Sequence, residues 1–213
     1  MPYPDSQTLI QGLDVSRETI QSLESFAKDL ERWSSAINLV GHATLNDSWR
    51  RHILDSAQLL RLTGGDPGEW CDLGSGGGLP GLVVAILLKE RFPHAQTTLM
   101  ESDARKAAFL KTIVRKHDLN ARVLVERIEL ATPQNSRVIS ARALAPLSSL
   151  LVHVRRHICV GGVALLHKGK NFQQEVEEAL RSWHFNLDVV DSLIDRDAKI
   201  LKISALEPKV EKQ

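Results

Sequence analysis

A glycine-rich segment with the sequence DLGSGGGLPG, at residues 72–81, constrains the fold of this chain more than any other feature. It follows a short apolar run, 69–73, that predicts a strand, and it leads into an apolar stretch, 80–90, that predicts a helix. Glycine has no Cβ atom, so such a loop can turn sharply and lie close to a ligand at the amino end of the helix. The order strand, glycine loop, helix therefore predicts a nucleotide-binding α/β domain.

Strand-like and helix-like segments alternate after residue 67, which predicts a mostly parallel sheet with helices on both faces. We predict strands over 69–73, 97–100, 122–125, 137–140, 162–167, 186–192 and 199–205, and helices over 80–90, 104–116, 147–158 and 172–183. The last two strands are joined by 193–198 without a helix, so they form a hairpin that places one antiparallel strand in the sheet. A seven-stranded sheet of this kind resembles the class I methyltransferase fold, a Rossmann-like α/β fold.

Apolar residues recur every three or four positions in the first third of the chain, which predicts helices that pack on the sheet as a cap. The runs are Leu23, Phe26, Ala27, Leu30, Trp33 and Ile37, and then Ile53, Ala57 and Leu60. A turn cluster at 63–68, TGGDPG, ends this pattern. We therefore predict an N-terminal helical cap over 1–66 and an α/β domain over 67–213.

Composition predicts an ordinary globular protein of 213 residues with a net charge of +1. No apolar run is long enough for a membrane span, and the N-terminus lacks a signal-like core, so we expect a cytoplasmic protein without a membrane partner. We also expect a monomer, although no feature of the sequence indicates the oligomeric state. Cys71, on a predicted strand, and Cys159, at a predicted helix end, lie in apolar surroundings. We expect both to be reduced and buried.

Charge is unevenly distributed along the chain. Residues 130–174 contain no acidic residue but carry Arg137, Arg142, Arg155, Arg156, Lys168 and Lys170. Such a segment favours contact with a polyanion. The alternative is that these are solvated charges on unrelated faces.

The glycine loop is compatible with two cofactors. Gly76, Gly78 and Gly81 match the G-x-G-x-x-G spacing of dinucleotide sites, but the turn is better placed to begin at Gly74. Asp72, at the strand end, would repel a pyrophosphate, whereas it suits the ammonium group of S-adenosylmethionine, directly or through water. We therefore favour S-adenosylmethionine over NAD.

Two later strand ends supply further candidate contacts. Glu101 follows the second strand and can accept hydrogen bonds from both ribose hydroxyls of a nucleoside. Ile128 and Glu129 follow the third strand and are placed to border an adenine ring. Because NAD enzymes also hold ribose with an acid, Glu101 predicts a nucleoside without choosing the cofactor.

Several segments together resemble the ribosomal RNA small subunit methyltransferase G family, also called glucose-inhibited division protein B. They are Arg32-Trp33 with Ile37-Asn38-Leu39-Val40, the motif Arg51-His52-Ile53-Leu54-Asp55-Ser56, the glycine loop with Leu79-Pro80-Gly81, Val138-Ile139-Ser140-Ala141-Arg142-Ala143, and Lys168-Gly169. The resemblance implies methylation of guanine N7 in 16S ribosomal RNA, on naked RNA or in the small ribosomal subunit. It also implies that Gly74, Leu79, Ile128, Glu129 and Arg142 contact the cofactor.

The chemistry agrees with the residues available. Guanine N7 carries a lone pair and no proton, so methyl transfer needs positioning and charge stabilisation but no side-chain acid or base. The motifs used for exocyclic amines and for cytosine C5 are absent from the sequence. We predict a cofactor site of Asp72, Gly74, Ser75, Gly76, Gly78, Leu79, Glu101, Ile128, Glu129 and Arg142, RNA contacts at Arg50, Arg51, His52, Lys168 and Lys170, and positioning roles for Arg142 and Lys168.

Alternatives remain open for several of these residues. Arg51 and His52 could instead pair with Asp55 on the next helical turn. His153 and His157 have a spacing seen in metal sites, but no third ligand accompanies them, so we expect no metal. Trp33 and Trp49 are better suited to the core than to base stacking. For the whole protein the alternatives are an NAD(P)-dependent oxidoreductase and a noncatalytic RNA-binding module with a degenerate cofactor pocket.

Overall fold

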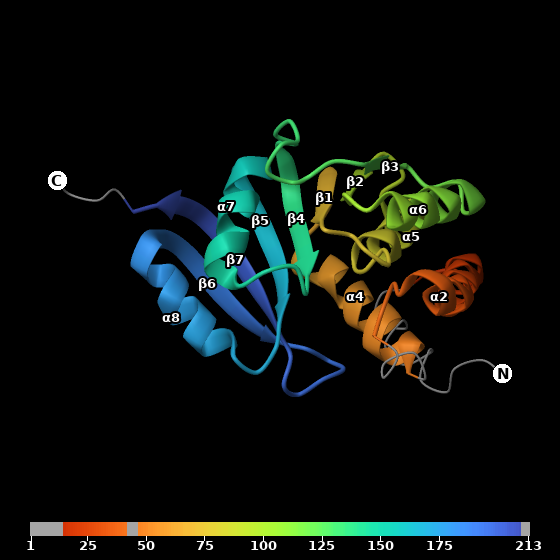
Figure 1. The fold of residues 1–213 in the computed structure, drawn as a ribbon, viewed down its shortest axis with the longest axis horizontal. Helices are drawn as coiled ribbons and strands as arrows, with labels where there is room; N and C mark the ends of the chain where they lie inside the picture. The colour runs from red at the N-terminus through yellow and green to blue at the C-terminus, as the bar shows by residue number, and fades with distance from the viewer. Residues whose placement is uncertain (1–14, 42–46, 210–213) are drawn as a thin grey trace.

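A seven-stranded sheet forms the centre of the protein (Figure 1). The computed structural model describes residues 15–41 and 47–209. The strand order is β3-β2-β1-β4-β5-β7-β6. The strands are β1 (Glu69–Leu73), β2 (Gln96–Met100), β3 (Ala121–Leu124), β4 (Ser136–Arg142), β5 (Ile158–Lys168), β6 (Trp183–Asp191) and β7 (Lys199–Pro208). Strands β1 to β5 pair in parallel, and β7 runs antiparallel to both β5 and β6.

The predicted strands and the C-terminal hairpin are confirmed, with most ends displaced by one to a few residues. The largest difference is β5, which begins at Ile158 rather than near Gly162. Cys159 therefore lies on a strand and not at a helix end, and it is partly exposed, contrary to the expectation of burial. Cys71 is fully buried in β1, and this burial raises the pKa of its thiol.

Helices cover both faces of the sheet because strand residues point alternately to its two sides. Trp70 and Leu99 join a core under α5 (Gly81–Arg91) and α6 (Ala104–Lys116). Cys71 and Met100 join the other core, under α7 (Leu147–His157) and α8 (Phe172–Ser182). Within the described residues, no helix combines the length and apolar character that a membrane crossing requires.

The N-terminal helices extend the first of these cores. Helix α2 (Arg17–Ile37) packs Leu23, Phe26 and Leu30 against it. A continuous helical stretch follows as a π-helical turn η1 (Trp49–Leu54), α4 (Asp55–Ala57) and a 3₁₀ turn η2 (Gln58–Leu62). Residues 1–14 and 42–46 of the predicted cap lie outside the described residues, and the boundary at residue 66 stays a prediction.

The start of α2 is fixed to the end of α5. Ser16 caps α2 by accepting a hydrogen bond from the Thr19 amide, at 3.2 Å. The Glu90 carboxylate of α5 accepts bonds from the Ser16 amide, at 2.9 Å, and from the Thr19 hydroxyl, at 2.5 Å. These contacts hold the cap in one position on the α/β domain.

We predict that Phe26→Ala destabilises the whole protein and not α2 alone. Phe26 is fully buried and its ring lies 6.4 Å from that of Phe109 in α6. Truncating a buried phenylalanine costs roughly 3–5 kcal/mol, which should appear as a lower urea midpoint in a single unfolding transition. Lys28→Ala, at an exposed position of the same helix, is the control. Two separate transitions in the variant would show that the cap unfolds independently.

Candidate active site

The glycine loop turns out of β1 in a conformation that favours glycine. Gly74, Gly76 and Gly78 all have positive φ, at 67°, 50° and 83°. A Cβ atom on Gly74 would lie 2.6 Å from the Leu144 side chain. The loop therefore requires glycine both for its backbone angles and for its contact with the segment after β4.

Glu101, immediately after β2, holds this loop in place. One carboxylate oxygen accepts a hydrogen bond from the Gly76 amide at 2.9 Å, and the other accepts one from the Asp103 amide at 2.7 Å. The Ser75 amide donates to the Met100 carbonyl at 2.8 Å, which fixes the loop to the same strand end. Because only 9% of Glu101 is exposed, it is a buried acid placed at the edge of the loop.

A cavity of about 960 Å³ opens beside the loop. It lies outside the carboxyl ends of β1, β2 and β4, where the strand order reverses and α/β folds bind ligands. It brings together most of the predicted cofactor residues, namely Gly74, Ser75, Gly76, Leu79, Glu101, Ile128, Glu129 and Arg142. Gly78 belongs to the loop but does not line the cavity.

Asp72 is a correction to the predicted site. Its side chain is fully buried and does not line the cavity. The Ser140 hydroxyl donates to it at 2.6 Å, and the Trp70 indole in turn donates to Ser140 at 2.8 Å. Burial raises the pKa of Asp72 to about 6, although the bond from Ser140 acts in the opposite direction. Asp72 therefore lies within the first core behind the loop, apart from the cavity lining.

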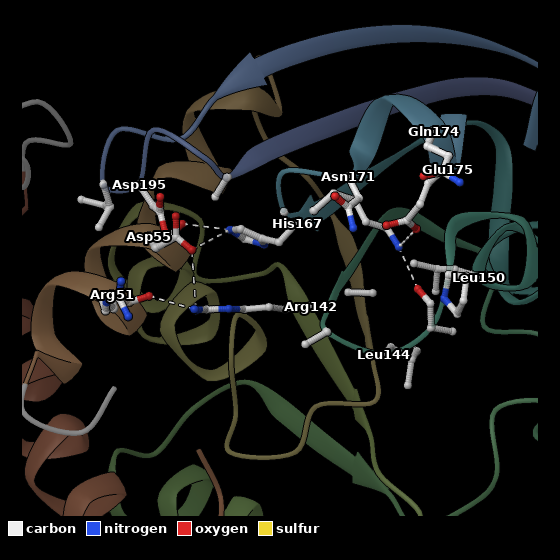
Figure 2. A pocket seen from close by; sticks show the side chains of 18 of the residues that line it. Arg51, Asp55, Arg142, Leu144, Leu150, His167, Asn171, Gln174, Glu175 and Asp195 are labelled. Atoms are coloured by element: carbon white, nitrogen blue, oxygen red, sulfur yellow. Dashed lines mark hydrogen bonds and ion pairs between the residues drawn. The ribbon is translucent and has the colours of Figure 1, made fainter. Parts of the chain in front are cut away.

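Asp55 is the centre of a cluster that the sequence did not single out as a site. Figure 2 shows it between Arg142, at the end of β4, and His167, at the end of β5. Its carboxylate lies 3.6 Å from Arg142 Nη1 and 3.4 Å from His167 Nε2. Asp55 therefore contacts the ends of two strands, and its charge also acts on His52, whose pKa it raises against the larger effect of burial. Arg142 also donates to the Arg51 carbonyl at 2.9 Å.

A second cavity, of about 700 Å³, lies on the other side of Arg142. The segment 142–145 lines both cavities. Asp55 and Arg51 border the second cavity at one side, and Asn171, Gln174 and Glu175 at the other (Figure 2). The two cavities thus adjoin along one short segment after β4.

The predicted RNA-contact residues divide into two groups. Arg50, Arg51 and Lys170 are exposed, as a contact with RNA requires. His52 is buried in the wall of the first cavity, and burial together with the charge of Arg142 lowers its pKa to about 4. Lys168 is paired with Glu175 at 2.7 Å, with only 8% of its side chain exposed. His52 and Lys168 are therefore not exposed cations, and a contact of either one with RNA stays a prediction.

The remaining candidates have structural roles. His157 is fully buried, accepts a bond from the Gln134 amide and contacts the Ile128 carbonyl at 2.9 Å through its other nitrogen. In the part of the chain that is described, no three potential metal ligands gather. Trp49 is buried, and Trp33 packs on Phe109 at 5.4 Å, as core residues.

The site residues that sequence reasoning missed are His167 and Glu175, together with the role of Asp55. Each lies close to a feature that the sequence analysis did select. His167 precedes Lys168, Glu175 lies near the start of the last long helix, and Asp55 belongs to the motif that begins with Arg51-His52. Their common signal is a polar residue at the carboxyl end of a strand or in a segment packed against it. Nothing in their spacing indicates which partner each one meets.

The fold is that of the class I methyltransferases. The protein aligns with a SAM-dependent methyltransferase from Aquifex aeolicus with a TM-score of 0.56 and 14% identity, over 73% of this chain and 91% of the other. A TehB-like SAM-dependent methyltransferase from Corynebacterium glutamicum gives a TM-score of 0.54 and 15% identity, over 70% and 86%. The predicted fold class is confirmed.

The chain belongs to the family described as rRNA small subunit methyltransferase G, whose model matches residues 19–200. It is 46% identical to "Ribosomal RNA small subunit methyltransferase G" of Ruegeria sp. (strain TM1040), over 92% of this chain and 95% of the relative. The enzyme of the same name from Rhizobium meliloti is 45% identical, over 92% and 94%. The cofactor of the present protein is S-adenosylmethionine. Nothing in these comparisons favours the oxidoreductase or the noncatalytic alternative.

The raised pKa of Asp72 predicts an unusual pH dependence of stability. A carboxyl whose pKa rises from 3.8 to about 6 on folding stabilises the protein while protonated, below pH 4. That contribution, about 3 kcal/mol, is lost as pH rises through 6. In urea titrations between pH 4 and 6.5, we expect the free energy of unfolding of the wild type to fall with rising pH relative to that of Asp72→Asn, because asparagine does not titrate. Asp188→Asn, on the exposed side of β6, should follow the wild type, and equal pH slopes for all three proteins would contradict the assignment.

Proposed function

We propose that this protein transfers a methyl group from S-adenosylmethionine to N7 of a guanine in 16S ribosomal RNA. The observation that carries the proposal is the pair of adjoining cavities, one beside a glycine loop of the methyltransferase type and one lined by the exposed Arg51 and by Gly169 and Asn171, the neighbours of the exposed Lys170. Family membership gives the reaction class, and the geometry supports an acceptor that approaches from the second cavity.

The residues around the first cavity fit the cofactor. Glu101 is fixed by two amides and can accept bonds from ribose hydroxyls, while Ile128 offers an apolar surface to adenine. The backbone of Gly74 and Gly76 lines the cavity without side chains that would obstruct it. When bound, S-adenosylmethionine supplies the electrophilic methyl group.

Acceptor chemistry at N7 asks little of the side chains. Guanine N7 has a lone pair and no proton, so accepting a methyl group there would need no side-chain base. His52, with its lowered pKa, is neutral near pH 7, so it adds no positive charge where a cationic product forms. Arg142, held by Asp55 and the Arg51 carbonyl, is the positioning residue between the two cavities.

Exposed cations beside the second cavity support contact with the RNA backbone. Arg50 and Arg51 come from η1, and Lys170 follows β5 at the end of the acid-free segment. Phosphate contacts of this kind supply affinity without base specificity. We further propose that the protein acts as a monomer in the cytoplasm, where its RNA substrate is found.

Incubation of the protein with methyl-labelled S-adenosylmethionine tests the proposal. The acceptors are small ribosomal subunits, naked 16S RNA and, as a control, large-subunit RNA. We expect label in one of the first two and, after chemical cleavage at N7-methylguanine, a single cleaved position. Label in large-subunit RNA alone, or label without N7-methylguanine, would overturn the assignment.

Glu101→Ala should weaken binding of S-adenosylhomocysteine by roughly 1–3 kcal/mol in calorimetric titration, because hydrogen bonds to ribose are lost. The exposed Glu69, at the start of β1, provides the control as Glu69→Ala. Circular dichroism checks that the loop change leaves the fold intact. An affinity equal to that of the wild type would remove Glu101 from the site.

The double variant Arg51→Ala, Lys170→Ala should weaken RNA binding and leave cofactor affinity unchanged. Each lost phosphate contact should lower the slope of log affinity against log salt by roughly 0.7–0.9. Lys209→Ala is the control, because Lys209 follows antiparallel β7, which ends at the other end of the strands from Lys168 and the cavities. A salt slope that does not change would show that these two side chains do not contact phosphate.

A further inference from the structure

We propose that the second cavity is the pocket for the acceptor guanine and that Glu175 recognises the N1–H of its Watson–Crick edge. This inference rests on the proposed function and adds the site and the residue that select the base. Its starting point is that 142–145 lines both cavities, so ligands held in the two would meet across this segment.

The size of the second cavity suits one nucleotide. At about 700 Å³ it lies within the roughly 300–1,000 Å³ typical of small-molecule sites. An RNA base that undergoes chemistry leaves its stack and enters such a pocket as a single unpaired residue. Leu144 and Leu150 provide apolar lining for a purine ring.

Glu175 is oriented by contacts to one of its two oxygens. Oε2 accepts hydrogen bonds from the Leu147 amide and from Lys168 Nζ, both at 2.7 Å. Lys168 is itself held by the Ala145 carbonyl at 2.7 Å. Among the described residues none donates to Oε1, and 26% of the side chain is exposed in the cavity wall. A preorganised carboxylate with one available oxygen is a ready acceptor for a base donor.

Guanine is the RNA purine that fits this acceptor. Its Watson–Crick edge presents N1–H and the N2 amino group as adjacent donors, whereas N1 of adenine is an acceptor that a carboxylate repels. Glu178, one turn along α8, lines the same cavity and lies near enough in the helix to accept from N2. Two carboxylates also disfavour a phosphate in this cavity and favour a ring that becomes cationic on methylation.

This orientation directs N7 towards the cofactor. N7 lies on the opposite side of the purine from the N1 and N2 donors. Helix α8 lines only the second cavity, while 142–145 separates the two. A guanine whose N1 edge meets Glu175 therefore turns N7 away from α8, in the direction of Arg142 and the first cavity.

Binding of free nucleotides to the protein saturated with S-adenosylhomocysteine tests the pocket directly. The probes are guanosine and adenosine 5′-monophosphate, titrated with detection by NMR. We expect the wild type to prefer the guanosine nucleotide by about tenfold or more, the value of one charge-assisted hydrogen bond. Glu175→Gln should reduce this preference to about twofold or less. Glu177→Gln, on an exposed position of the same helix that does not line the cavity, should keep it.

Single-turnover methyl transfer to small-subunit RNA gives a second measurement. Glu175→Gln should slow transfer by about tenfold or more and leave the affinity for S-adenosylhomocysteine near that of the wild type, measured at a temperature where circular dichroism shows the variant to be folded. The inference is overturned if the wild type binds both nucleotides equally or neither at millimolar concentration, or if Glu175→Gln keeps the guanosine preference. A guanosine preference that depends on Glu175, without transfer to ribosomal RNA by the wild type, would instead refute the proposed function and retain the pocket.

Discussion

The buried carboxylate of Asp55 joins the parts of this protein that form its site. It accepts hydrogen bonds from Gln58 at 2.7 Å and from Ser192 at 2.8 Å, and it meets Arg142 and His167 at the ends of β4 and β5. A buried charge is stable only when such partners replace its hydration. The helical segment at 49–62, two central strands and the C-terminal hairpin are therefore held together at one point, and this point lies in the wall of the second cavity.

The first cavity depends on a different arrangement, in which acids stabilise a loop that contains no charged side chain after Asp72. Glu101 accepts a hydrogen bond from the Gly76 amide of the loop on the cavity side, and Asp72 is buried beneath the loop on the side of α5. The loop is therefore fixed by the Glu101 carboxylate on its cavity side and by the Ser75 amide bond to β2, without a cofactor. Such preorganisation reduces the entropy that binding must cost.

Much of the fold was predictable because it follows from local patterns. The strand and helix periods located every element of the α/β domain, and the lack of a helix between the last two strands predicted the hairpin. Gly74, Gly76 and Glu101 were predictable because a strand end fixes where the next residue lies. Asp72 was misplaced, although strand alternation puts it on the same side of β1 as Trp70, under α5 and away from the cavity.

Contacts between distant segments were not predictable in the same way. Lys168 was expected to face RNA, yet it pairs with Glu175. The two residues are seven positions apart, one at the end of β5 and the other in α8, and this spacing alone does not predict the contact. Likewise, the sequence offered Arg51 and His52 as neighbours of Asp55, and only the order of strands places Arg142 and His167 beside it. Side-chain partners of this kind depend on the packing of whole elements.

The position of Arg142 has a consequence for how two ligands would influence each other. Arg142 lines both cavities, and its guanidinium donates a hydrogen bond to the carbonyl of Arg51, which lines the second cavity. A ligand that shifts the guanidinium from one side changes the space and charge available on the other. Thermodynamic linkage then requires that each ligand change the affinity of the protein for the other by the same factor. Binding in one cavity would therefore change binding in the other through a single side chain.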